Sequence, residues 1–128
     1  MTGQHSRRLA ARMSVALLLA GGACVHRTGT VEPASLIFIN EAPEAADVFA
    51  IVPSVSSVRL GTVMQGERRE LVIPSRVIRI GSTVNIVARL FSRGTQASSG
   101  PVSIPSGGIL QVTLPVGGTQ LIVETGRR

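Results

Sequence analysis

Residues 83–91 read TVNIVARLF and carry the clearest secondary-structure signal in the chain. Every second residue from Val84 to Leu90 is apolar, while the intervening positions include Asn85 and Arg89. Successive side chains of a β-strand point to opposite faces, so this alternation places the apolar set on one side of an extended strand. The stretch therefore predicts a strand with one face in a hydrophobic core.

Shorter apolar runs of the same kind surround this stretch, separated by Gly, Pro and Asn. They span residues 34–40, 47–52, 56–63, 68–73, 101–104, 109–114 and 119–124, and residues 76–80 form either an edge strand or an ordered crossing loop. The run 34–40 is apolar on both faces, so we expect it to lie centrally in a sheet or beneath a covering element. Closely spaced strands with Gly and Pro between them are typical of a sandwich or small barrel. We predict an all-β fold, a small antiparallel β-sandwich of about seven strands, either Ig-like or transthyretin-like.

Four local features of this sandwich can also be predicted. Residues 58–74 are the most hairpin-like stretch, with a turn at 65–67, and Gly61 indicates a bulge or bend. Residues 92–100 (SRGTQASSG) form the longest polar loop, and the polar tail 125–128 is expected to be frayed.

The segment before the domain has the pattern of an export signal. Three arginines between residues 7 and 12 precede an apolar stretch, roughly 13–20, which ends in small residues before Cys24, the single cysteine. A signal peptide has this order of basic, apolar and small-residue regions. The apolar stretch is shorter than the about twenty residues that a membrane-spanning helix needs.

Residues 19–24 (LAGGAC) resemble the lipobox of bacterial lipoproteins, with Gly22 and Ala23 in its two small positions and Gly21 where Leu is usual. The resemblance implies that Cys24 is lipidated and becomes the first residue of the mature protein. Lipoproteins that stay at the inner membrane of Gram-negative bacteria tend to have Asp directly after the lipidated cysteine. Val25 holds that position here, so the resemblance implies sorting to the outer membrane. An ordinary cleaved signal and a retained N-terminal helix are the alternatives.

This interpretation divides the chain into four parts. Residues 1–23 are a signal peptide with a signal helix, 24–33 the lipidated cysteine and a flexible tether, 34–124 the β-sandwich and 125–128 the tail. Three of the 13 basic residues leave with the signal, so the mature chain has only a small excess of positive charge over its 7 acidic residues. The remaining arginines are scattered and Trp and Tyr are absent, which argues against a nucleic-acid partner.

The domain offers few groups for catalysis or metal binding. After residue 33 the sequence has no His, Lys or Cys, so the usual catalytic bases and zinc ligands are missing. Glu41, Glu44 and Asp47 are the only candidate acid–base groups or calcium ligands, but a solvated turn explains them better, and no EF-hand pattern supports calcium. Arg68 and Arg69 fit a charged hairpin rim. The Gly pairs at 107–108 and 117–118 fit turns because no helix follows them.

We therefore expect no enzyme activity, no cofactor and no metal. The expected function is that of a lipid-anchored envelope protein, located at the outer membrane and facing the periplasm or cell surface. It would contact another envelope protein through an exposed strand edge or residues 92–100. The alternative is a binder of a small apolar or lipidic ligand between the sheets, which requires an internal cavity of roughly 300 Å³ or more.

Overall fold

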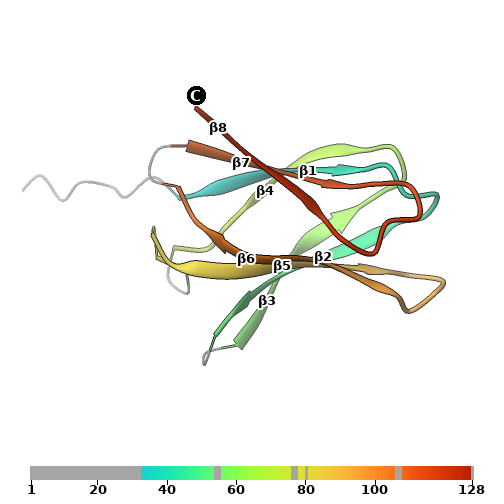
Figure 1. Cartoon of the computed structure of the whole chain (residues 1–128), viewed down its shortest axis with the longest axis horizontal. Coiled ribbons are helices and arrows are strands. Elements are labelled where there is room, and N and C mark those ends of the chain that lie inside the picture. Colours follow the sequence, from blue (N-terminus) through green and yellow to red (C-terminus); the bar gives the residue numbers. More distant parts are fainter. Residues whose placement is uncertain (1–32, 54–55, 76–77, 80, 106–107, 128) are drawn as a thin grey trace, which may run out of the picture.

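The computed structural model describes residues 33–127 except 54–55, 76–77, 80 and 106–107, and this part of the chain contains eight strands in two packed sheets (Figure 1). The predicted signal helix and residues 24–32 of the tether lie outside the described residues. The strands are β1 (Ser35–Asn40), β2 (Ala46–Val52), β3 (Ser56–Val63), β4 (Arg68–Val72), β5 (Thr83–Leu90), β6 (Gln96–Ser103), β7 (Gly108–Leu114) and β8 (Ile122–Arg127).

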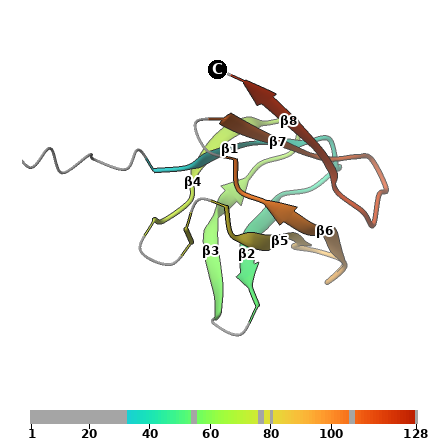
Figure 2. The same cartoon turned by 60° about the vertical axis from the view of Figure 1, so that its left-hand side comes forward.

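One sheet has the order β4-β1-β7-β8 and the other the order β3-β2-β5-β6, and the two lie face to face (Figures 1 and 2). Neighbouring strands are antiparallel except β1 and β7, which are parallel. The predicted all-β sandwich is confirmed. Immunoglobulin sandwiches keep their first two strands in one sheet, whereas β1 and β2 lie in different sheets here. The eight strands divide equally, four in each sheet.

The core lies between the sheets and is almost entirely aliphatic. On β5, Val84, Ile86 and Ala88 are fully buried, as the alternation in residues 83–91 predicts. Phe38 is the one aromatic side chain in the described core. Other large apolar side chains that are fully buried come from both sheets and from the ends of strands, and they are Leu36, Val48, Val63, Ile73, Ile104, Leu110, Val112 and Leu114. Removal of this apolar surface from water is the main stabilising contribution to the fold.

Strand β1 lies centrally, between β4 and β7, as predicted. Leu36 and Phe38 point into the core, while Ile37 and Ile39 are half-buried on the outer face.

The predicted hairpin over residues 58–74 is wrong. β3 pairs with β2, and β4 pairs with β1, so the turn between them carries the chain from one sheet to the other. The bulge predicted at Gly61 is confirmed, because Val48 pairs with Gly61 and Phe49 with Arg59, which leaves Leu60 as the extra residue. A Cβ atom on Gly61 would lie 3.0 Å from Leu71 Cδ2, so glycine here allows β3 and β4 to approach closely.

Two other connections differ from the predictions. The loop predicted at 92–100 is shorter, because β6 begins at Gln96 and pairs with β5. The prediction of a frayed tail is wrong for residues 125–127, because β8 continues to Arg127 and pairs with the start of β7. Within residues 76–80, Ile78 is buried outside any strand, which supports a crossing loop.

The sheets stay separate along most of their length. Residues 119–121 lie along the edge of β6, where Ser98 N–H donates to the Thr119 carbonyl and Leu121 N–H donates to the Ser98 carbonyl. This gives a single isolated bridge between Ser98 and Gln120 in the described part of the chain. The fold is therefore a sandwich rather than a closed barrel.

The two ends of the sandwich have different connections. Residues 41–45, 64–67, 91–95 and 115–121 each follow an odd-numbered strand and together form one end, which we call the loop end (Figure 1, right). The N-terminal end of β1 and the C-terminal end of β8 lie at the opposite end. Among the described residues there is no helix with the length and apolar character to span a bilayer.

Candidate functional site

The residue singled out for lipidation, Cys24, lies outside the described residues, so its modification stays a prediction. The loop end is the part of the domain where described side chains form a pocket.

Asn40, the last residue of β1, is fully buried and ties three segments together. Its side-chain amide donates hydrogen bonds to the carbonyl oxygens of Glu44 (2.8 Å) and Val63 (3.0 Å). Its Oδ1 accepts a hydrogen bond from the Ala42 N–H (3.0 Å). Asn favours turns because its side chain can bond to backbone groups nearby. Here it fixes the β1–β2 loop and joins that loop to the end of β3.

Backbone hydrogen bonds connect the remaining loops to this centre. Asn40 N–H donates to the Glu67 carbonyl and Gly66 N–H donates to the Asn40 carbonyl, which docks the β3–β4 turn. Glu41 N–H donates to the Leu114 carbonyl at the end of β7. Ser92 N–H donates to Glu44 Oε2 (2.9 Å), which joins the β5–β6 turn to the β1–β2 loop. All four loops therefore belong to one hydrogen-bonded structure.

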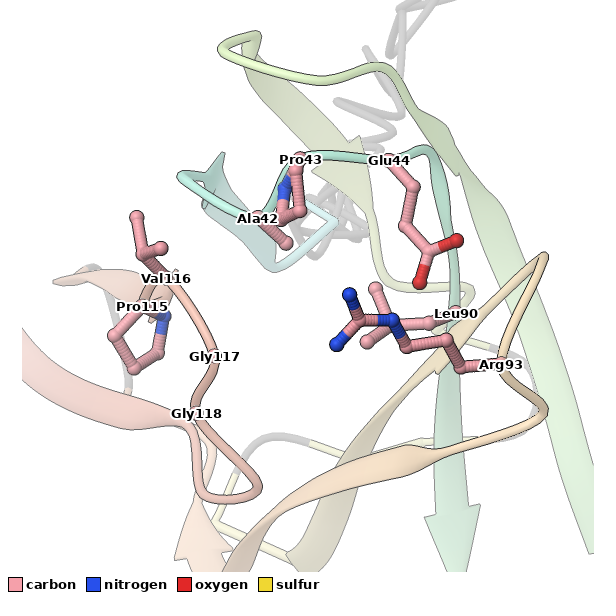
Figure 3. Close-up of a pocket in the computed structure, with 9 residues that line it drawn as sticks. All are labelled: Ala42, Pro43, Glu44, Leu90, Arg93, Pro115, Val116, Gly117 and Gly118. Atoms are coloured by element: carbon pink, nitrogen blue, oxygen red, sulfur yellow. The ribbon is translucent and has the colours of Figure 1, made fainter.

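A pocket of about 140 Å³ opens between three of these loops (Figure 3). It is lined mainly by apolar groups, with two charged residues, and its lining residues are Ala42, Pro43, Glu44, Leu90, Arg93, Pro115, Val116, Gly117 and Gly118. Gly117 has a φ of +67°, and Gly118 N–H donates to the Pro115 carbonyl. The predicted turn at residues 117–118 is confirmed, and it forms one wall of the pocket. The other predicted glycine turn differs, since Gly108 begins β7 and Gly107 lies outside the described residues.

Three large apolar side chains are exposed at the loop end, and one of them, Val116, lines the pocket. Met64 is 60% exposed, Phe91 61% and Val116 74%, and each lies in or beside a turn of the loop end. Single exposed apolar side chains are ordinary on protein surfaces, and Val72 on β4 and Ile122 on β8 are exposed to a similar degree.

The three candidate carboxylates lie in different environments. Asp47 belongs to β2 and forms an ion pair with Arg59 (Nη2 to Oδ1, 2.6 Å). The Thr62 hydroxyl donates to the same Oδ1 (2.6 Å). Glu44 instead accepts the Ser92 N–H, and Glu41 is exposed on the loop. No group of three His, Cys, Asp or Glu side chains suited to a metal ion exists among the described residues.

The electrostatics of Asp47 fit an ion pair rather than a general acid or base. The hydrogen bond from Thr62 lowers the pKa of Asp47, with smaller contributions from the hydrogen bond and charge of Arg59 and the charge of Arg89. Burial acts in the opposite direction. A carboxyl group that acts as a general acid or base near neutral pH needs a raised pKa instead.

The arginines predicted to form a charged rim are partly used in structure. Arg69 Nη1 donates to the Thr62 carbonyl (2.8 Å), which links β4 to β3 across the open side of the sandwich. A second, more open hollow of about 460 Å³ lies there, lined by Arg59–Thr62 on β3 and Arg69–Val72 on β4. It is more polar than the loop-end pocket, and Arg59 and Arg69 already have partners in the protein.

Comparison with protein-family models, with curated proteins and with solved structures finds no match to this chain. The candidate site therefore stands on the geometry of the described residues alone. The sequence predicts residues 92–100, which include Arg93, as one possible contact surface, but it does not predict that residues 40–44 and 115–118 lie beside them.

Proposed function

We propose that the chain is a non-enzymatic, lipid-anchored protein of the bacterial envelope whose β-sandwich binds another envelope protein through its loop end. The position of the loop end carries this proposal: it lies opposite the end of the sandwich where β1 begins.

The anchor and the loop end are compatible in geometry. A lipid on Cys24 would leave nine residues before Pro33, a segment of at most about 30 Å when fully extended. The first strand then runs away from the tether toward Asn40. A domain held in this way has its termini toward the membrane and its loop end toward other envelope components.

The surface chemistry of the loop end suits a protein partner. Met64, Phe91 and Val116 offer apolar contact area, and the hydrogen bonds around Asn40 hold the loops that carry them. Binding to loops that are already ordered costs less conformational entropy than binding to loops that must order on contact. Rigid loops with exposed apolar residues are therefore suited to specific recognition.

The alternative, a small apolar ligand held between the sheets, has weaker support. Fully buried side chains from both sheets, including Phe38, Ile86 and Leu110, occupy the core between them. The loop-end pocket is smaller than the roughly 300 Å³ at the lower end for small-molecule sites. The hollow between β3 and β4 is larger, about 460 Å³, but it is open to solvent and lined more by polar than by apolar groups.

Photo-crosslinking in native membranes tests the proposal. A photoreactive amino acid would replace Val116 at the loop end or, as the matched control, Val72, which is 59% exposed at the far end of β4. We expect a crosslinked protein partner from position 116 and none from position 72. Equal crosslinking from both positions, or crosslinks to lipid only, would remove the loop end as the binding surface.

A further inference from the structure

The size of the loop-end pocket limits what it can hold. Its volume of about 140 Å³ is below that of small-molecule sites, which begin near 300 Å³. Walls formed by Ala42, Pro43, Leu90, Pro115 and Val116 are apolar. The pocket therefore fits one apolar side chain rather than a whole cofactor or lipid.

The walls of the pocket are held in fixed positions. Ala42 is hydrogen-bonded through its N–H to Asn40 on one side. On the other side a Cβ atom at Gly118 would collide with the ring of Pro115, so the turn packs tightly on itself. An apolar pocket with rigid walls is the usual setting for an anchor side chain in a protein–protein contact.

Arg93 gives the pocket a charged group at its mouth. In Figure 3 its guanidinium extends from the β5–β6 turn into the space between residues 42–44 and the turn at 115–118. Arg93 has no hydrogen bond or ion pair to any other described residue, in contrast to Arg59 and Arg69. An arginine fork is suited to a carboxylate, which it binds through two parallel hydrogen bonds.

Glu44 is the one acidic group in the pocket lining. Its Oε2 accepts the Ser92 N–H, and the terminal nitrogens of Arg93 point away from it toward the 115–118 turn (Figure 3). Glu44 therefore stabilises the position of the β5–β6 turn and leaves the guanidinium available to a ligand.

The last residue of a polypeptide carries a carboxylate beside its side chain. When that residue is apolar, it offers both of the groups that this pocket can bind. We infer that the loop-end pocket binds the C-terminal residue of a partner protein, with an apolar side chain in the pocket and the terminal carboxylate on Arg93. The inference rests on the proposed function and names the chemistry of the partner at that same surface.

A peptide titration of the full-length protein in detergent, followed by amide NMR shifts, tests the inference. The probe is an N-acetylated Gly-Gly-Leu peptide with a free carboxylate, compared with its C-terminal amide and with isovaleric acid. Arg93 is exposed, where an ion pair contributes up to about 1 kcal/mol, so the free acid should bind up to about fivefold tighter than the amide. The shifted amides should be those of Ala42, Leu90 and Gly117.

Two variants assign the effect to the arginine. Arg93→Gln should reduce the affinity for the free acid to that for the amide. Arg79→Gln, at an exposed arginine of the β4–β5 connection at the opposite end, should leave it unchanged. Equal affinity for acid and amide, unchanged binding in Arg93→Gln, or shifts elsewhere on the domain would overturn the inference. Isovaleric acid binding as tightly as the peptide would overturn the assignment to a polypeptide.

The two proposals fail separately. Crosslinks from position 116 without carboxylate-dependent peptide binding would leave the proposed function standing and remove this inference. Peptide binding that depends on Arg93, without any protein crosslink in membranes, would support the pocket chemistry and contradict the envelope partner.

Discussion

Replacement of Asn40 by alanine should destabilise the domain strongly and release the loops of the loop end. Asn40 is fully buried, and its side chain makes three hydrogen bonds, two as a donor and one as an acceptor. Alanine cannot form any of them. The carbonyl of Val63 and the N–H of Ala42, both at buried residues, would lose their side-chain partner.

The magnitude follows from the number of bonds lost. A typical intramolecular hydrogen bond contributes about 1 kcal/mol net, and a buried group left without a partner costs about 1–3 kcal/mol. Asn40→Ala should therefore lower the free energy of unfolding by about 3 kcal/mol or more, against a total of about 5–15 kcal/mol for a domain. For a domain of this size the melting temperature should fall by at least about 12 °C.

Urea denaturation of the purified protein measures this change, and Asn85→Ala is the matched control. Asn85 is half-buried, and its Oδ1 accepts hydrogen bonds only from the hydroxyls of Ser98 and Ser99. Those hydroxyls can turn to other acceptors, so Asn85→Ala should cost less than about 1 kcal/mol. A loss below about 1 kcal/mol in Asn40→Ala, or equal losses in the two variants, would refute the role assigned to Asn40.

Further predictions concern the β2–β3 and β3–β4 contacts. Thr62→Val should raise the pKa of Asp47 toward its ordinary value of 3.8, as measured by carboxyl ¹³C NMR, and an unchanged pKa would contradict the hydrogen-bond assignment. Since folding lowers the pKa of Asp47, the stability that Asp47 contributes is present above pH 3.8 and is lost as the pH falls through the pKa of the folded state. Acid denaturation should show a smaller loss of stability in Thr62→Val. Gly61→Val should lower the free energy of unfolding by about 1–3 kcal/mol because the new side chain crowds Leu71. Adding Leu71→Ala to that variant should cost less stability than Leu71→Ala does in the native chain. Losses that simply add in urea denaturation would exclude this contact.

The strands that could be predicted from the sequence are those whose side chains separate into a buried and an exposed face. Residues 83–91 and 109–114 alternate regularly, and both form strands in which alternate residues are buried in the core. β6 escaped prediction in its first half because Gln96, Ser98 and Ser99 are polar or small, and an edge strand needs little apolar surface.

Strand partners could not be predicted from local signals. A Gly turn at residues 65–67 indicates only that the chain reverses. It does not determine whether the following strand pairs with the preceding one. Here β3 pairs with β2, and β4 pairs with β1. The strands before and after the turn therefore belong to different sheets.

The geometry of the candidate site depends on this topology, so only the contact role of residues 92–100 could be predicted. Arg93, Ala42 and Pro115 are far apart in the sequence and meet because every second connection lies at the same end of the sandwich. The predicted carboxylate group shows the converse, since Glu44 and Asp47 are three residues apart but interact with different neighbours.

The anchor at Cys24 is the claim on which the orientation of the domain depends. The intact mass of the protein extracted from its native membrane, measured beside a Cys24→Ala variant, tests it. We expect a mature chain that begins at Cys24 and carries added acyl mass, with the variant lacking that mass and no longer retained in the membrane fraction. A soluble native species without lipid, or an uncleaved chain, would contradict the account and leave the loop end without a defined orientation toward the membrane.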